Sequence, residues 1–546
     1  MINRCGFAAL LFLLLLAGAG WARLAGLDHR PMHTDEAVQA VIFGDLLEEG
    51  DYTYDPYEYH GPTLMYATLP AARLAGAEGL ASLDEIPLRV VPVVFGLLCL
   101  LLSAALIRPL SFPAAWTGAL LAAVSPAFLY YNRYYIHETL LVFGTFLLLI
   151  ALGRWARTRT VSAAVLAGVA AGWMIATKET AVLSYFSIAA AGLILYRGRV
   201  FAALRDHPVH GALALGSALA VTVVFYTSFF TNPEGLAAAV RSVTHYLPRA
   251  GGEGHEKPWY YYLVLFGGHS RGGVFWSEGL ILGMAVFGTI RACRPRREGG
   301  MRGSALVRFF GLYALILLIV YSAIPYKIPW LMLSFIHIAA VVAGWGVVAL
   351  FRDLRGRRVW TALAAVLLLG ATLHLARQSA LVRTRYASAP RNPYVYSHTS
   401  ADLLRGIEHV QTAARHHPEG RAMTVKVISG EYWPIPWYLR GFERTGYWKQ
   451  PPADPAAPVV ILDMDTAETL GPQFDDTHTA ELVGLRAGVI LQFLYRNDLW
   501  QKIITPPGSH SDPASHSDSH SDSDSDSDSP PPSDSVSSFS SLSHVH

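Results

Sequence analysis

The sequence is organised by a series of apolar blocks, each roughly 16 to 22 residues long, which short polar segments separate. About 20 apolar residues form a helix that crosses the hydrocarbon core of a bilayer. Of the 546 residues, 52% are hydrophobic and 15% are charged, whereas about 25% are charged in soluble domains. We predict a polytopic α-helical membrane protein with about eleven spans, near residues 5–24, 88–107, 113–131, 138–153, 161–177, 181–196, 209–228, 279–293, 305–323, 328–350 and 360–376.

Arginines gather in every second loop between these predicted spans, within 154–159, 197–205, 294–302 and 352–358. Lysine and arginine are retained on the cytoplasmic side of a membrane. The pattern therefore predicts a multi-pass protein of the plasma (inner) membrane with a cytoplasmic N-terminus and an outer C-terminal part. The first block also resembles a cleavable signal peptide, an alternative that leaves the following residues on the outer face.

Beyond residue 376 the composition changes to that of a water-soluble domain. The stretch "SADLLRGIEHVQTAARHH" predicts a helix, and "TVKVIS", "VVILDM" and "VILQFLYR" predict strands. We expect a small extracytoplasmic α/β domain over 377–507, after a transmembrane domain over 1–376. The Ser/Asp/His-rich tail, 508–546, has little apolar surface to bury and is predicted to be disordered. The net charge of +2 gives no reason to expect a nucleic-acid partner.

Two adjacent acids, Asp35 and Glu36, follow the first apolar block in "MHTDEAVQA", within a first outer loop over 25–87. Ionisable groups near membrane depth are costly and point to a function. One interpretation is structural, with Asp35 as the N-cap of the next helix and Glu36 as a first-turn acid. Because neighbouring side chains on a helix point in different directions, we expect one acid to act as a base and the other to hydrogen-bond within the loop.

Cations and acids recur in the other segments predicted to face outward. Arg133 and Glu138 lie in "YYNRYYIHETLLVF", Lys178 lies in "ATKET", and Tyr326 and Lys327 lie in "IPYKIPW". Each cation alone could be an interface anchor whose stem lies along the apolar surface. Together they would hold a lipid phosphate, because guanidinium and ammonium groups are the usual phosphate partners.

The first outer loop also contains "YDPYEYHGPTLMY", whose aromatic rings suit a membrane interface. An amphipathic helix on the membrane would explain them. Glu58 and His60 could instead bind a divalent ion with His269 as a distant third ligand. The segments "GGEGHEKPW" and "GGHSRGG" lack the flanking strand and helix of a phosphate-binding loop. We interpret them as flexible outer loops that close over a substrate.

The ordered series "HTDEA", "YHGPTLMY", "YYIHE", "ATKET", "PYKIPW" and "EYWPIPWYLR" resembles GT-C type membrane glycosyltransferases. Within them, the chain is most similar to the protein O-mannosyltransferase and aminoarabinose-transferase branch, family 39. More narrowly, it resembles the flippase-activity-associated membrane protein family, over most of residues 1–500.

The resemblance implies transfer of a sugar from a polyprenyl-phosphate donor to an acceptor at the outer face, with membrane lipid as a further partner. By this resemblance Asp35 takes the catalytic position, with Glu36 and Glu138 as further acids. The donor phosphate would be bound by Arg133, Lys178, Lys327, Tyr326 and His60, and a divalent ion could assist. The alternative is a non-catalytic protein that binds lipid-linked oligosaccharide or assists its flipping.

Overall fold

The computed structural model describes residues 4–50, 52–57, 60–249, 251, 254–294 and 301–505. One compact unit extends to Ile503 and holds the membrane helices and the C-terminal α/β domain. Glu58 and the predicted disordered tail, 508–546, lie outside the described residues.

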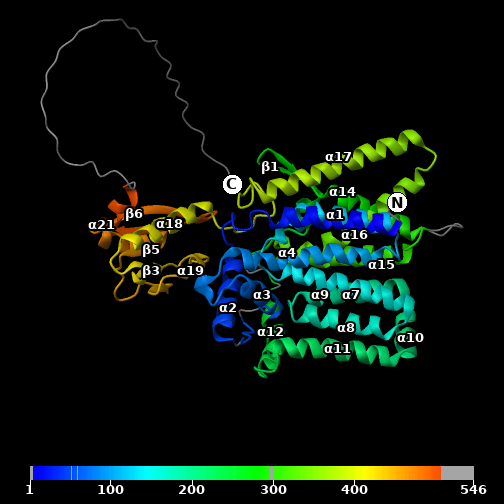
Figure 1. Ribbon diagram of the computed structural model, residues 1–546, viewed down its shortest axis with the longest axis horizontal. Coiled ribbons are helices and arrows are strands. Elements are labelled where there is room, and N and C mark those ends of the chain that lie inside the picture. Colours follow the sequence, from blue (N-terminus) through cyan, green and yellow to red (C-terminus); the bar gives the residue numbers. More distant parts are fainter. Residues whose placement is uncertain are drawn as a thin grey trace, which may run out of the picture. The chain divides into compact units, whose positions relative to one another are not determined.

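Long apolar helices form the membrane domain, as predicted (Figure 1). Among the described residues, seven helices are long and apolar enough to cross a bilayer: α1 (Arg4–Leu24), α4 (Glu85–Leu102) with η2 (Ser103–Leu106), α7 (Glu138–Thr158), α11 (Pro208–Tyr226), α15 (Ser304–Ala323), η3 (Pro329–Met332) with α16 (Leu333–Asp353), and α17 (Arg358–Arg383). Helix α9 (Ala181–Tyr196) continues into α10 (Gly198–Asp206) through a 100° bend. Helices α5 (Phe112–Ala123), α8 (Val161–Ile175) and α14 (Gly279–Cys293) are shorter and apolar. Each predicted span coincides with one of these helices.

Two boundaries differ from the sequence prediction. The predicted span 113–131 is broken after α5, because Ser125 caps a separate short helix, α6 (Pro126–Tyr131), that begins with proline. The last helix continues to Arg383, so the C-terminal domain begins beyond the predicted residue 377.

Helix α16 forms the centre of the bundle. In the window of η3 and α16, 89% of the residues are buried, against 6% in α11 and in α17. Glycines let its neighbours approach closely: a Cβ on Gly344 would collide with the backbone nitrogen of Gly118 in α5, and one on Gly346 would collide with the carbonyl oxygen of Met284 in α14. The weakly buried helices α11 and α17 therefore present their apolar surfaces to lipid.

The short elements that follow the predicted outer motifs gather at the end of the bundle opposite α10 (Figure 1). They are α2 (Thr34–Glu49), α3 (Thr63–Leu74), η1 (Leu80–Ser82), α12 (Gly235–Arg249), α13 (Tyr261–Gly267) and the hairpin β1 (His269–Arg271) and β2 (Val274–Trp276). The arginine-rich segments 154–159, 197–205 and 352–358 follow α7, α9 and α16, so these arginines and the polar motifs occupy different ends.

The C-terminal domain contains one five-stranded sheet in the order β4-β3-β5-β7-β6. Strands β4 (Thr445–Trp448), β3 (Val425–Ile428) and β5 (Val459–Asp463) are parallel, and β7 (Val489–Arg496) and β6 (His478–Arg486) are antiparallel. The helices are α18 (Ala401–His416), α19 (Ile435–Tyr438), α20 (Met464–Leu470) and α21 (Asn497–Ile504), with η4 (Gly420–Ala422) and η5 (Gly471–Phe474). The predicted helix and three strands are present, and β4 and β6 were not predicted.

Helix α19 and Arg440, two residues after it, attach this domain to the first outer loop. The Trp437 indole N–H donates to Glu85 Oε1 at 2.8 Å, and the backbone N–H of Met32 donates to the Tyr438 hydroxyl at 2.8 Å. The Arg440 guanidinium donates to the carbonyl of Leu83 at 2.6 Å. The domain thus fixes the loop that carries the acidic pair.

Candidate functional site

Glu36 is fully buried and is bound by two arginines. Arg30 donates to both carboxylate oxygens at 2.9 Å, and Arg89 donates to the same oxygens at 2.9 and 3.0 Å. Burial alone would raise the pKa of Glu36, but the charges and hydrogen bonds of Arg30 and Arg89 hold this pKa well below its usual range. Glu36 is therefore an ionised anchor within the protein.

The same carboxylate organises the start of α2. It accepts the backbone N–H of His33 at 3.0 Å and that of Tyr135 at 2.9 Å. His33 is the N-cap, because its Nδ1 accepts the backbone N–H of Asp35 at 3.1 Å, forming a capping box with Glu36. The interpretation of Asp35 as N-cap is therefore wrong: the helix begins at Thr34 and Asp35 lies in its first turn.

Asp35 is presented at the surface by this buried network. Its side chain is 47% exposed, and its Oδ1 lies 3.9 Å from His33 Nδ1. Burial raises the pKa of the Tyr396 hydroxyl, and the neighbouring Tyr326 and the charge of Asp35 raise it further. Tyr396, in the segment that leads to the C-terminal domain, lies at the start of α2, because its carbonyl oxygen is 3.0 Å from His33 Nε2. Solvent or a substrate can reach the half-exposed Asp35 carboxylate.

Arg133 and Lys327, two predicted phosphate ligands, are bonded to backbone carbonyls. Arg133 donates to the carbonyls of Arg23, Ala25 and Gly26 at 2.5, 2.9 and 2.6 Å, at the end of α1. Burial, followed by the charge of Arg30, lowers the pKa of Arg133 to about 9. The Lys327 ammonium donates to the carbonyls of Lys257, at 3.1 Å, and Ile324, and burial lowers its pKa.

Lys178 and His60, two further predicted phosphate ligands, each contact an acid. Lys178 forms a buried ion pair with Glu138. His60 Nδ1 lies 2.9 Å from Glu179 Oε2, and its ring centre lies 5.3 Å from that of His137. Burial alone would raise the pKa of Glu179, but His60 holds it below its usual value. Tyr326, the fifth predicted ligand, forms a β-bridge with Glu256.

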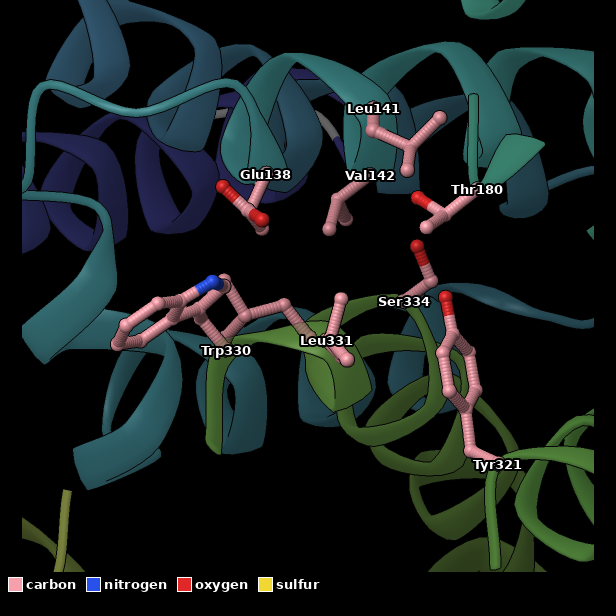
Figure 2. Close-up of a pocket in the computed structure, with 9 residues that line it drawn as sticks. Glu138, Leu141, Val142, Thr180, Tyr321, Trp330, Leu331 and Ser334 are labelled. Carbon is pink, nitrogen blue, oxygen red and sulfur yellow. The ribbon is translucent and has the colours of Figure 1, made fainter. Parts of the chain in front are cut away.

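Glu138 faces a small cavity inside the bundle (Figure 2). Figure 2 shows Glu138 and Thr180 on one side of it and Trp330, Ser334 and Tyr321 on the other. The cavity volume is about 10 Å³, roughly the room that one water molecule needs. Among the described residues, Glu138 Oε2 has no hydrogen-bond partner. Trp330 connects this cavity to the acidic loop, because its ring lies 5.6 Å from that of His33.

A larger cleft, with a volume of about 700 Å³, lies beside Tyr396. Its walls come from the segment 257–271, the linker 388–401 and the turn 484–487. They include Lys257, His269, Arg271, His398 and Arg486. The sequence identified the two glycine-rich segments only as outer loops, because nothing in it brings 257–271 together with 484–487.

The described residues do not form a metal site by themselves. No group of three His, Cys, Asp or Glu among them could hold a metal ion. His60 faces Glu179, whereas His269 Nδ1 contacts the Val264 carbonyl at 3.3 Å in the wall of the cleft. Glu58, the other predicted ligand, lies outside the described residues, so a divalent ion held by Glu58, His60 and His269 stays a prediction.

Three residues that organise the site were missed at the level of sequence, namely Arg30, His33 and Arg89. Arg89 offered a signal, since it is a single cation at the start of the apolar run "EIPLRVVPVVFGLL" and an arginine there needs a partner. Arg30 and His33 offered none beyond their closeness to the acidic pair.

Comparisons with known proteins agree with this architecture. Residues 71–226 match the family model described as dolichyl-phosphate-mannose-protein mannosyltransferase. The structure of ArnT from Cupriavidus metallidurans bound to undecaprenyl phosphate is similar at a TM-score of 0.63 and 17% identity, covering 89% of this chain and 98% of that one.

The Archaeoglobus fulgidus oligosaccharyltransferase tethered with an acceptor peptide is similar at a TM-score of 0.54 and 13% identity, covering 87% of this chain and 72% of that one. The chain has the GT-C fold. Among curated protein sequences there is no match. This GT-C chain is a multi-pass membrane protein, and its narrower resemblance to the flippase-activity-associated family stays a prediction.

Proposed function

We propose that this GT-C chain is a membrane glycosyltransferase that moves a sugar from a polyprenyl-phosphate donor to an acceptor at the outer face of the plasma (inner) membrane. The observation that carries the proposal is the contrast between the neighbouring acids. Glu36 is fully buried between two arginines, whereas the Asp35 side chain is 47% exposed. A helper that only binds a lipid phosphate has no need for an exposed carboxylate on a helix turn that is fixed by a buried ion pair.

Asp35 would act as the general base. Its carboxylate takes the proton of an acceptor hydroxyl while the hydroxyl oxygen attacks the anomeric carbon of the donor. The bond from that carbon to the phosphate oxygen breaks, and the polyprenyl phosphate leaves with the electron pair. Glu36 positions Asp35 by fixing the first turn of α2 through His33 and Arg89.

The leaving phosphate needs cationic or hydroxyl partners. The predicted set is Arg133, Lys178, Lys327, Tyr326 and His60, of which Arg133 and Lys327 donate to backbone carbonyls. Lys178 and His60 would first have to release Glu138 and Glu179. The similarity to ArnT, whose structure is described as bound to undecaprenyl phosphate, supports a lipid-phosphate carrier of this class.

The test uses the full-length protein reconstituted in liposomes with labelled polyprenyl-phosphate sugars and a membrane extract as acceptor source. Asp35→Asn should lower the release of polyprenyl phosphate by at least about 100-fold, the usual scale of a lost general base. Glu49→Gln, at the exposed far end of α2, serves as the matched control and should behave as wild type. Donor that binds without turnover, together with an Asp35→Asn variant indistinguishable from wild type, would favour the lipid-binding alternative.

A further inference from the structure

The cleft beside Tyr396 has the dimensions of a ligand site. Its volume of about 700 Å³ lies within the range of roughly 300–1,000 Å³ that is typical of small-molecule sites. Membrane-domain residues such as Tyr261 and Val264 form one wall, and Gly484 and Arg486 of the C-terminal domain form another. A ligand in the cleft would therefore contact both domains.

The charges in the cleft are of one sign. Lys257, Arg271 and Arg486 line it, and no Asp or Glu is among the described residues that do. Arg486 is paired with Glu431, whereas Lys257 and Arg271 form no ion pair within the described part of the chain. Two acids lie near these cations without lining the cleft: Asp402 accepts the Gly484 N–H at 2.7 Å, and Glu256, which precedes Lys257, is fully exposed to solvent. The cleft is thus suited to an anion.

His398 adds a second, independent indication of a ligand. The residue is 4% exposed and lines the cleft, and neither ring nitrogen has a hydrogen-bond partner among the described residues. Buried polar groups are hydrogen-bonded in the great majority of cases. The ring stacks on His33 at 5.5 Å with an interplanar angle of 14°, so its position is fixed beside the start of α2.

The cleft adjoins the proposed base. Tyr396 lines the cleft, and its carbonyl oxygen lies 3.0 Å from Nε2 of His33, the N-cap of the helix whose first turn holds Asp35. A general base lies within hydrogen-bond reach of the hydroxyl that it deprotonates. A cleft that borders the base is therefore on the side of the acceptor.

We propose that this cleft binds the acceptor, and that the acceptor carries a phosphate or carboxylate group held by Lys257 and Arg271. Tyr261 and Tyr396 offer aromatic surface to the sugar part of such a molecule. The assignment to the acceptor rests on the proposed role of Asp35, but binding of the anion does not require turnover.

The test measures binding to the full-length protein in nanodiscs by equilibrium dialysis. The probes are labelled glucose 6-phosphate and glucose, a pair that differs in one phosphate. We expect the phosphate to strengthen binding about tenfold, the scale of one charged hydrogen bond, and Lys257→Gln/Arg271→Gln to remove that gain. Arg415→Gln, at the opposite end of α18 and bonded only to Thr412 among the described residues, is the control and should bind within twofold of wild type.

A second arm measures binding of undecaprenyl phosphate added to the nanodisc, which the double substitution should leave unchanged. Loss of this binding in the double variant would assign the cleft to the donor and overturn the proposal. Equal binding of the two sugars, or phosphate-dependent binding that survives the double substitution, would also overturn it. Asp35→Asn should retain wild-type binding, so a failure of the transferase proposal stays distinguishable from a failure of this one.

Discussion

Arg89 and Glu36 form an ion pair in which neither side chain is exposed to solvent, with Arg89 Nε 2.9 Å from one carboxylate oxygen and an Arg89 terminal nitrogen 3.0 Å from the other. Arg89 belongs to the membrane helix α4 and Glu36 to the outer helix α2. Moving two charges out of water is costly and is compensated only by good geometry and further hydrogen bonds. The pair therefore fixes the outer loop to the bundle in one arrangement.

Removing Glu36 should destabilise the protein, because Arg30 and Arg89 would remain buried without a counter-charge. We expect Glu36→Ala to cost roughly 3–5 kcal/mol and to lower the melting temperature in detergent, followed by intrinsic fluorescence. Glu36→Gln, which keeps the shape, should cost less. Asp35→Asn should melt as wild type. An unaltered melting temperature for Glu36→Ala would show that the network does not support the fold.

Acidification should destabilise the protein through buried histidines before it affects Glu36. Burial holds the pKa of His398 well below its usual value. Below pH about 6.5 the His398 imidazole is therefore protonated in the unfolded chain but still neutral in the folded protein. The stability that neutral His398 contributes is present above pH about 6.5 and is lost as pH falls, by about 1.4 kcal/mol per pH unit. The pKa of Glu36 is held below its usual value, so the stability that ionised Glu36 contributes is lost only when the pH falls below the ordinary pKa of a glutamate.

The melting temperature of wild type should therefore fall between pH 7.5 and pH 5.5, and His398→Asn should reduce this fall. His137, whose pKa is also held well below its usual value by burial, would account for part of the remaining dependence. His416→Asn, at an exposed position of α18, is the control. An identical pH dependence in wild type and His398→Asn would contradict the prediction.

The membrane helices could be predicted because each one is a continuous block of apolar residues in the sequence. Two strands could not. The strand β4 has four residues, all partly exposed, and β6 is buried on alternate positions only at its end, so neither shows a clear period of two. The parallel pairing of β4 with β3 makes β4 a strand through contacts distant in sequence.

The candidate site was predictable where a motif is local and not where it is assembled from distant segments. The acidic pair was visible in "HTDEA", but the different roles of its members depend on Arg89, more than fifty residues away. Likewise, Lys178 was expected to bind phosphate, and the fold pairs it with Glu138, at the start of α7 and forty residues earlier in the chain. Hydropathy places such residues on the same face of the membrane but does not pair them.

The pair of Glu138 and Lys178 can be tested for its structural and catalytic roles separately. Glu138→Gln should destabilise the protein by roughly 3–5 kcal/mol, because it leaves the buried Lys178 ammonium without its partner. The double variant Glu138→Gln/Lys178→Met should recover most of the melting temperature. If Glu138 acts in catalysis, the double variant stays inactive in the polyprenyl-phosphate release assay. Recovery of activity together with stability would leave the pair a structural role only.

The attachment of the C-terminal domain should depend on α19. Arg440 lies 3.8 Å from the centre of the Trp437 ring and donates to the Leu83 carbonyl, and Trp437 is fully buried. We expect Trp437→Ala to speed hydrogen exchange in the linker 384–400 and at residues 32–35, while the membrane helices exchange as in wild type. Trp500→Ala, which contacts Tyr495 within the C-terminal domain, is the matched control. Equal exchange in 32–35 for both variants would argue against this attachment.

Substitution of Arg133 distinguishes a structural role of this side chain from a role in binding the donor phosphate. Its guanidinium donates to three carbonyls at the end of α1, and a buried acceptor left without its donor costs about 1–3 kcal/mol. Arg133→Met should therefore lower the melting temperature clearly, and Arg133→Lys should recover only part of it, because one ammonium cannot reach all three carbonyls. For protein that remains folded, the KM for the polyprenyl-phosphate donor should not change. If Arg133→Met instead has a normal melting temperature and a raised KM for the donor, and Arg133→Lys lowers that KM again, then Arg133 binds the donor phosphate, as the sequence predicted.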